Sequence, residues 1–260
     1  MNKIINKILF IYKITSIGGD FFSKARLFKE ILRIQAHFYL GGKNKPFDCL
    51  IQNNEQKVLV SFSGTLDEMH ALIEIFIDRC YDPKVKKISK VLDLGANIGL
   101  ATVWYSTEFP GCKIDSYEPN PTVYALLKKN TERLNGARAF NMAISNDNSS
   151  KTFYISNRSF SSSTHEIPNS KESVVVARSI DSAIENIGGN VDVIKIDIEG
   201  EEFTAIEQSK KIGEVNIILG ESHPYKAGVE RDTMKKILTK THKTYSEEEK
   251  DKSIFYATKN

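Results

Sequence analysis

The chain has 260 residues, of which 40% are hydrophobic and 27% are charged, and its formal net charge is +3. This composition is that of an ordinary globular protein, and the length suits one large domain with an appendage. So small a net charge, with no basic stripe, argues against a dedicated nucleic-acid binder. The three cysteines, Cys49, Cys80 and Cys112, are far apart and form no C-x-x-C pair. We therefore predict no disulfide framework and no zinc site, and we expect a cytoplasmic protein.

The N-terminal segment MNKIINKILFIYKI has apolar residues at helical spacing, with its lysines elsewhere around the helix. Its apolar runs are too short to cross a bilayer, and it lacks the apolar core and cleavage site of a signal peptide. We expect a helix that packs on its own domain or on a partner subunit. The alternative is a basic amphipathic helix lying on an anionic membrane, which would place the protein peripherally at the inner face of the membrane.

Residues 1–88 are predicted to form a small α+β extension. A helical pattern covers residues 21–38 and ends at a glycine pair, and a hairpin follows with strands at 49–52 and 57–62. A second helix is predicted over residues 66–79, because Asp67 and Glu68 lie in its first turn.

Residues 89–260 are predicted to form an α/β domain, because short apolar segments alternate with amphipathic ones. This alternation predicts a doubly wound, mostly parallel sheet, and the runs 243–245 and 253–258 predict an antiparallel terminal hairpin. Strands at 151–155 and 173–179 flank a polar loop, whose serine-rich part (159–164, followed by His165) predicts a mobile surface loop, with a substrate lid as the alternative. The other predicted strands are 90–94, 113–118, 137–144, 191–197 and 215–221, and the predicted helices are 98–107, 122–134, 180–186, 201–211 and 229–239.

A glycine-containing loop follows the first strand of this domain, where a parallel sheet binds its ligands. It runs from Asp93 through Gly95, Ala96 and Asn97 to Gly99. The first glycine allows a sharp turn close to a ligand, and the second allows the next helix to pack closely on the sheet. Asp93 could receive a cationic amino group.

Glu118 ends the second strand, where a carboxylate can accept hydrogen bonds from both hydroxyls of an adenosine ribose. Such a site fits either a nicotinamide dinucleotide or S-adenosylmethionine. The loop offers G-x-x-x-G and not the G-x-G-x-x-G that seats a pyrophosphate. The charge of Asp93 would also repel a diphosphate, whereas it suits the amino group of methionine. The loop therefore favours S-adenosylmethionine.

Several segments together resemble the FkbM family of S-adenosylmethionine-dependent methyltransferases. They are VLDLGANIG, SYEPNPTVYALLKKNTERLN, NMAIS, VIKIDIEGEE and IILGESHP, preceded by LDEMHALIEIFIDRCYDP, and they cover residues 66–224 in the order of the family. The resemblance implies a seven-stranded Rossmann-like methyltransferase sheet and methyl transfer to a hydroxyl of a sugar, a glycan or a related small molecule. It also implies that Asn141 and Ala143, within NMAIS, and Asp197 help to bind the cofactor.

A second group of polar residues ends the fourth and fifth strands of the domain. A sugar hydroxyl is a very weak acid, so a base that takes its proton during methyl transfer would help. We predict that His223 or Asp197 is this base, and that Glu199, Glu221 and Lys195 orient the substrate. We predict no metal site, although Asp197, Glu199, Glu221 and His223 could instead bind a divalent cation.

Three other functions are weighed against a hydroxyl methyltransferase. A methyltransferase that acts on nucleic-acid amines would show a Pro-Pro-aromatic motif after the fourth strand, but the sequence there reads Asp-Ile-Glu-Gly. The main alternative is an NAD-dependent oxidoreductase on a Rossmann-like sheet. The third is a module that binds the cofactor without catalysis.

Overall fold

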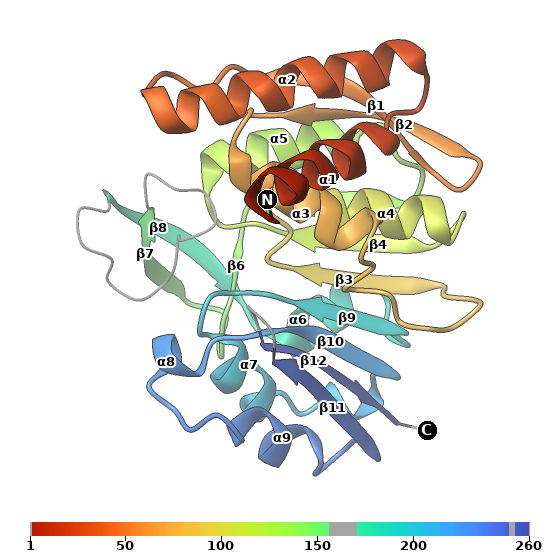
Figure 1. The fold of residues 1–260 in the computed structure, drawn as a ribbon. Coiled ribbons are helices and arrows are strands. Elements are labelled where there is room, and N and C mark those ends of the chain that lie inside the picture. Colours follow the sequence, from red (N-terminus) through yellow and green to blue (C-terminus); the bar gives the residue numbers. More distant parts are fainter. Residues whose placement is uncertain (1, 156–170, 250–252, 260) are drawn as a thin grey trace.

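The computed structural model describes residues 2–155, 171–249 and 253–259 (Figure 1). Among these residues, seven strands form one sheet in the order β11-β12-β10-β9-β3-β4-β5. All neighbouring strands are parallel except β12, which is antiparallel to β10 and β11. The predicted doubly wound sheet with a terminal hairpin is confirmed. The strands are β3 (Lys90–Leu94), β4 (Lys113–Tyr117), β5 (Ala137–Phe140), β9 (Val193–Ile196), β10 (Ile217–Ser222), β11 (Thr244–Glu249) and β12 (Ser253–Thr258).

Helices cover both faces of the sheet. Neighbouring residues of each strand point to opposite sides, and because both sets are apolar, each face packs against helices. Val91 belongs to the core on one face, whereas Leu92 belongs to the core on the other. The first core is closed by α4 (Leu100–Glu108) and α5 (Pro121–Thr131). The second core is closed by α6 (Ile180–Asn186), α7 (Glu202–Gln208) and α9 (Thr233–Leu238).

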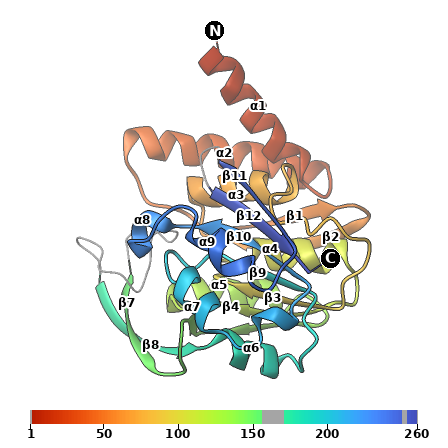
Figure 2. The same cartoon turned by 90° about the horizontal axis from the view of Figure 1, so that it is seen from below.

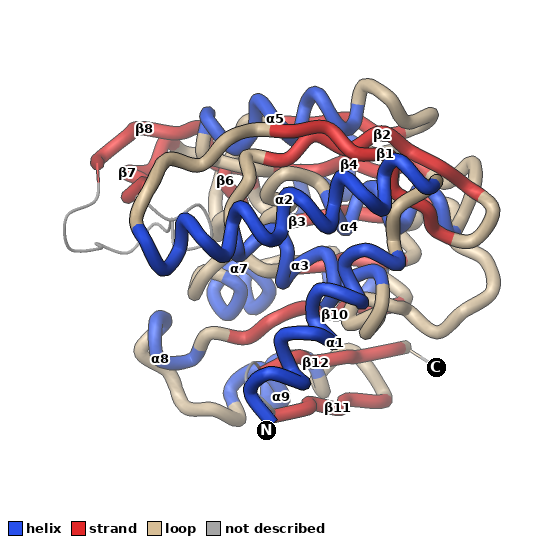
Figure 3. The backbone as a smooth tube through the Cα atoms, turned by 45° about the horizontal axis from the view of Figure 1, so that its top comes forward, coloured by secondary structure: helices blue, strands red, loops and turns tan. Residues whose placement is uncertain are grey.

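The N-terminal segment adds an outer layer on the α4–α5 side, as Figures 1 and 3 show. Asn130 of α5 ties this layer to the domain: its side chain hydrogen-bonds both backbone groups of Ser61 and the carbonyl of Ile98. Side chains from both sides of residue 88 share one core, so the segment is built onto the seven-stranded sheet. Its elements are α1 (Asn2–Ser16), α2 (Phe21–Leu40), β1 (Phe47–Asn53), β2 (Gln56–Phe62) and α3 (Leu66–Phe76).

The third predicted strand, 137–144, is wrong in its second half. The sheet strand β5 ends at Phe140, and the side chain of Asn141 then donates hydrogen bonds to the carbonyls of Glu118 and Pro119. These bonds turn the chain out of the main sheet and into a separate one. That sheet has the order β6-β8-β7, with β6 (Ala143–Ile144), β7 (Ser150–Ile155) and β8 (Lys171–Arg178).

Other boundaries also differ from the prediction. The helix expected over 201–211 ends at Gln208 and is followed by a short 3₁₀ turn, because Asp181 accepts hydrogen bonds from the backbone of Lys210 and Lys211. The helix expected over 229–239 is shortened, and α8 (Pro224–Ala227) precedes it, ended by the left-handed Gly228. The strand expected over 243–245 is longer, because β11 continues into the acidic residues that follow and ends at Glu249.

The serine-rich segment 159–164 and His165 lie outside the described residues. Within the described ranges, no helix combines the length and the apolar character needed to cross a membrane.

Candidate active site

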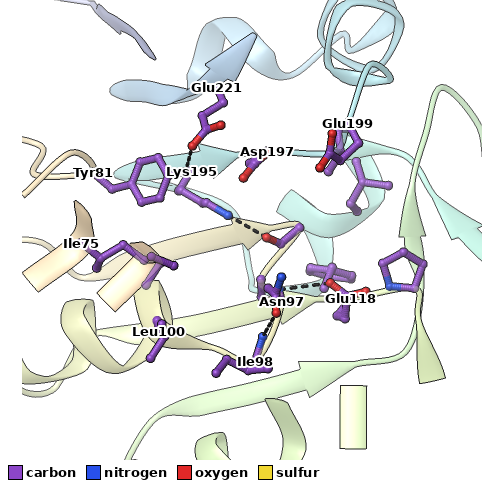
Figure 4. A pocket seen from close by; sticks show the side chains of 18 of the residues that line it. Ile75, Tyr81, Asn97, Ile98, Leu100, Glu118, Lys195, Asp197, Glu199 and Glu221 are labelled. Carbon is purple, nitrogen blue, oxygen red and sulfur yellow. Dashed lines mark hydrogen bonds between the residues drawn. The ribbon is translucent and has the colours of Figure 1, made fainter. Parts of the chain in front are cut away.

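A pocket lies at the carboxyl ends of β3, β4, β9 and β10, where the strand order of the sheet reverses (Figure 4). Ligands of open parallel sheets bind at this position. Six described lining residues are acidic and one, Lys195, is basic, so the pocket favours a cationic ligand. The predicted site residues that line it are Gly95, Ala96, Asn97, Glu118, Ala143, Lys195, Asp197, Glu199 and Glu221.

The loop after β3 forms the floor of the pocket and is fixed by main-chain contacts. The backbone N–H groups of Gly95 and Ala96 both donate to the carbonyl of Tyr117 at the end of β4. Gly95 has φ +77°, and a Cβ at this position would lie 1.8 Å from the carbonyl oxygen of Asp197. Only glycine therefore allows the loop to lie against the end of β9.

Glu118 lies beside this loop and accepts hydrogen bonds from two backbone N–H groups. These are the N–H of Asn97, at 3.1 Å, and that of Asn120, at 2.9 Å. Burial raises the pKa of Glu118 to about 7, against the lowering effect of the two backbone hydrogen bonds. Apolar side chains of Ile98, Pro119 and Ile144 flank it in the pocket. A carboxylate with apolar walls suits a ribose joined to a flat base.

Two other predicted cofactor residues act from behind the pocket and do not line it. Gly99 caps α4 with φ +90°, and a Cβ there would lie 2.8 Å from Leu127 of α5, so it allows the two helices to pack closely. The side chain of Asn141 holds the backbone next to Glu118 in place.

Asp93 also lies behind the pocket, and its surroundings differ from the predicted contact with the cofactor. It is fully buried and does not line the pocket. Its carboxylate pairs with Lys195, at 3.2 Å, and accepts a hydrogen bond from Thr102 of α4. The pair offsets the unfavourable burial of both charges. Asp93 thus holds Lys195, and not the amino group of a ligand.

Lys195 joins β9 to the glycine loop. Its Nζ donates to the carbonyl of Gly95 at 2.7 Å and lies 5.2 Å from the centre of the Tyr81 ring. Burial alone would lower the pKa of Lys195, but the charges of Asp93 and Asp197 outweigh this and raise it. The side chain therefore stays charged and positions the loop, and since Lys195 also lines the pocket, its predicted contact with substrate stays a prediction.

Three carboxylates form the opposite wall of the pocket, which we call the acidic wall: Asp197, Glu199 and Glu221 (Figure 4). The Nε2 atom of His223 faces all three, at 3.9 Å from Asp197, 3.5 Å from Glu199 and 4.0 Å from Glu221. Glu199 has φ +60°, a left-handed conformation that is unfavourable for a residue with a Cβ. The predicted cluster therefore exists, and it includes a strained turn after β9.

Glu202 fixes His223 in this position. It is fully buried, and its carboxylate accepts hydrogen bonds from the backbone N–H of His223, at 2.6 Å, and from Nδ1, at 3.0 Å. Burial alone would lower the pKa of His223, but the hydrogen bond and charge of Glu202, with the charges of Asp197 and Glu199, raise it to about 9. His223 is therefore an imidazolium at neutral pH, and it does not line the pocket.

Tyr81, which the pattern of strands and loops does not single out, completes the acidic wall. It follows α3, and its hydroxyl donates to Glu221 at 3.0 Å. Ile75 of α3 lines the pocket beside it. The only signal in the sequence is the resemblance of LDEMHALIEIFIDRCYDP to the family. In the sequence, Tyr81 precedes the first strand of the sheet and does not lie in a loop that follows a strand.

Asp197, Glu221 and His223 also lie close enough to share a divalent cation, since one ligand atom from each falls within 4.8 Å of the others. Removal of metal therefore tests the alternative of a metal-assisted reaction.

The sheet order, the antiparallel β12 and the pocket at the strand ends define a Rossmann-like α/β protein with a ligand site at the usual position. Comparison with known families gives the particular family. The model of the methyltransferase FkbM domain matches residues 93–246, and the chain belongs to this family.

Relatives of known name agree with this assignment. The chain is 31% identical over 135 residues to methyltransferase sdnD of Sordaria araneosa, covering 48% of this chain and 50% of that protein. It is 38% identical over 63 residues to the 31-O-demethyl-FK506 methyltransferase FkbM of Streptomyces tacrolimicus, covering 23% of this chain and 24% of that protein. The matched part thus spans half or less of each relative. An S-adenosylmethionine-dependent O-methyltransferase of Thermotoga maritima has a similar structure, with TM-score 0.46 and 10% identity over 86% of this chain and 80% of that one.

The residues of the pocket fit S-adenosylmethionine. Glu118 suits the ribose hydroxyls, and the acidic wall suits the positive charges of a sulfonium and an ammonium group. The same wall would repel a pyrophosphate, which the NAD-dependent alternative requires. Family and pocket together therefore set the oxidoreductase aside.

Proposed function

We propose that the chain transfers the methyl group of S-adenosylmethionine to a hydroxyl of a sugar, a glycan or a related small molecule, with Asp197 as the general base. The observation that carries the proposal is the acidic wall beside the cofactor loop. The bound cofactor supplies a methyl group on a sulfonium, which is already electrophilic. The task of the protein is then to hold a hydroxyl in line and to take its proton.

Asp197 is a better candidate for the base than His223. Asp197 lines the pocket and its backbone touches Gly95 of the cofactor loop, so a hydroxyl beside it would be next to the donor. His223 stands behind the carboxylates, and its pKa of about 9 leaves it protonated at neutral pH. Its Nε2 lies 3.9 Å from Asp197 and instead helps to orient that carboxylate.

The other members of the wall support a polyhydroxyl acceptor. Tyr81 occupies one oxygen of Glu221 and thereby fixes its orientation. Glu199 is held in place by its tight turn. An ionised carboxylate accepts hydrogen bonds and cannot donate them. Neighbouring hydroxyls of a sugar can donate to several such carboxylates at once. An isolated alcohol offers one such donor, so we expect it to be a poorer acceptor.

A transfer assay with isotopically labelled methyl donor tests the proposal. The purified chain is incubated with free sugars, sugar nucleotides, glycans, simple alcohols and aromatic amines, and the methylated atom is located by mass spectrometry and NMR. We expect label on a hydroxyl oxygen of a sugar-containing acceptor. Label on nitrogen alone would contradict the proposal. Tight binding of S-adenosylhomocysteine without any transfer would instead favour a non-catalytic module.

A further inference from the structure

The first two helices expose large apolar side chains that the fold leaves uncovered. In α1 the C-terminal half is packed inward, through the fully buried Ile14 and the partly buried Phe10 and Ile11. The N-terminal half projects from the body of the molecule, as Figure 2 shows. The expectation of a helix packed on its own domain thus explains only part of α1. The exposed apolar side chains of both helices, here called the N-terminal apolar surface, are Ile5, Ile8, Leu9, Tyr12, Phe21, Phe22, Phe28, Leu32, Phe38, Tyr39 and Leu40.

Helix α2 carries two apolar stripes, of which its own domain uses one. Leu27, Ile31 and Ile34 point inward and are buried. Phe28 and Leu32 follow at helical spacing on the outer side, and they are 49% and 43% exposed. An apolar stripe facing water is unfavourable in proportion to its area, and such a stripe marks a candidate docking surface.

The charges around this surface show which ligand it fits. Residues 1–46 contain nine lysines and arginines against two acidic residues, whereas the whole chain has a net charge of only +3. The remainder of the chain is therefore net acidic. Lys7, Lys24 and Lys29 are exposed among the apolar side chains. The positive charge of the protein is thus concentrated on the layer that bears the exposed apolar residues.

The two helices present one continuous surface. The Nζ atom of Lys7 in α1 lies 4.8 Å from the centre of the Tyr39 ring in α2. Protein interfaces deplete lysine at their centres, whereas helices that lie on membranes combine lysine and arginine with phenylalanine, leucine and tyrosine. This surface has the second composition.

We propose that the N-terminal apolar surface binds the anionic phospholipid headgroups of a membrane, with the side chains of α1 and α2 inserted at the headgroup level. Lysine and arginine attract the anionic surface, and the aromatic and aliphatic side chains enter the boundary of the acyl chains. The inference is independent of the methyl acceptor, because it uses no residue of the active site.

Sedimentation of the full chain with lipid vesicles tests the proposal. Vesicles of phosphatidylcholine alone are compared with vesicles containing about one third phosphatidylglycerol, at about 0.1 M and about 1 M salt. We expect binding to the anionic vesicles, weakened at high salt. Binding that is equal on neutral vesicles, or absent on anionic ones, would overturn the proposal.

Two sets of variants separate the apolar and the electrostatic contributions. Ile8→Ser with Tyr12→Ser, and Phe28→Ser with Leu32→Ser, change only exposed positions, and each pair is expected to weaken vesicle binding about tenfold or more. Lys24→Glu with Lys29→Glu is expected to act similarly at low salt and to lose its effect at high salt. Calorimetric binding of S-adenosylhomocysteine should stay unchanged in all of them, which shows that the fold is retained.

The matched control is Val174→Ser with Val176→Ser, two exposed apolar residues on β8 away from this surface. It should bind vesicles like the wild type, and an equal loss in this control would overturn the proposal. A second copy of the chain is the other candidate occupant. If the wild type formed dimers that the helix variants abolish, and bound no vesicles, the N-terminal apolar surface would be an interface between two copies of the chain.

Discussion

The side of the pocket formed by β3 and β4 is held mostly by backbone N–H donors, to which the side chains of Lys195 and Asn141 add, whereas the side formed by β9 and β10 is held by side chains. On the first side, the N–H groups of Gly95 and Ala96 hold the loop, and those of Asn97 and Asn120 hold Glu118. On the second, Tyr81 holds Glu221 and Glu202 holds His223. We call the β3–β4 side the cofactor side and the β9–β10 side the acceptor side, after the proposed function. Backbone donors do not change when side chains are substituted, so we expect single substitutions to alter the acceptor side more than the cofactor side.

The largest expected effect is on the acceptor side, from Asp197→Asn. Loss of a general base lowers the rate of methyl transfer by roughly 10²- to 10⁴-fold. The affinity for S-adenosylhomocysteine, measured by calorimetry, should fall much less than the rate, because Glu118 and the glycine loop keep their contacts when one carboxylate of the acidic wall is neutralised.

Glu185→Gln, an exposed carboxylate paired with Lys211, serves as its control and should keep full activity. If Asp197→Asn kept its rate while Glu199→Gln or Glu221→Gln lost it, the general base would be Glu199 or Glu221. The comparison of the two sides would then hold with a different residue as the base.

On the cofactor side, Glu118→Gln is expected to weaken binding of S-adenosylhomocysteine roughly 10- to 100-fold, because hydrogen bonds to a charged acceptor are lost. The pKa of Glu118 near 7 also predicts a pH dependence. The ribose hydroxyls favour the ionised carboxylate, so affinity should fall as the pH drops below 7, by up to about tenfold per pH unit. Calorimetry between pH 5.5 and 8.5, roughly, covers the transition. An equal slope in Glu118→Gln would show that another group titrates.

Tyr81→Phe tests whether the segment before β3 contributes to catalysis by orienting Glu221. Removal of its hydroxyl leaves a carboxylate oxygen of Glu221 without this partner, and kcat should fall about tenfold, with cofactor affinity retained. Tyr256→Phe is the matched control, since its hydroxyl donates to the carbonyl of Pro83 outside the pocket. Equal losses in both variants would indicate a general effect on folding.

His223→Gln should reveal the imidazolium through stability. Because the pKa of His223 is raised in the folded state, its stabilising effect is complete below its ordinary pKa of 6.5 and is lost as the pH rises through about 9. The melting temperature of the wild type should therefore exceed that of the variant by several degrees at about pH 6. This difference in melting temperature should disappear above about pH 9. A gap that is constant with pH would contradict a charged His223.

The smallest expected effect is that of metal removal, since we predict that no cation takes part. Exhaustive chelation should leave the rate of methyl transfer unchanged. Loss of activity that added Mg²⁺ restores would make Asp197, Glu221 and His223 a cation site, and the acidic wall would then be held by metal ligation.

The cofactor side could be predicted from the sequence because its residues follow the ends of predictable strands. Gly95 and Glu118 are found by counting from β3 and β4, and both line the pocket. Asp93 follows the same rule yet lies behind the pocket, because Lys195 from β9 reaches across to pair with it. Strand alternation alone does not reveal which long side chain crosses between neighbouring strands.

The acceptor side could be predicted only in part. Asp197, Glu199 and Glu221 end strands and were identified, but Tyr81 approaches from a segment 140 residues away along the chain. Such a contact depends on tertiary packing and leaves no periodic pattern. The break after Phe140 was missed for a similar reason, since it depends on the hydrogen bonds of the Asn141 side chain to another loop.

The wall contributed by Tyr81 and Ile75 has a practical consequence for work on this family. The recognisable methyltransferase domain begins at residue 93, but these two residues precede it and line its pocket. A truncated protein that begins at residue 93 would lose this wall of the pocket together with the first residues of the central strand β3. Exchange of residues 66–88 between relatives, by contrast, offers a way to alter acceptor choice while the donor site is left intact.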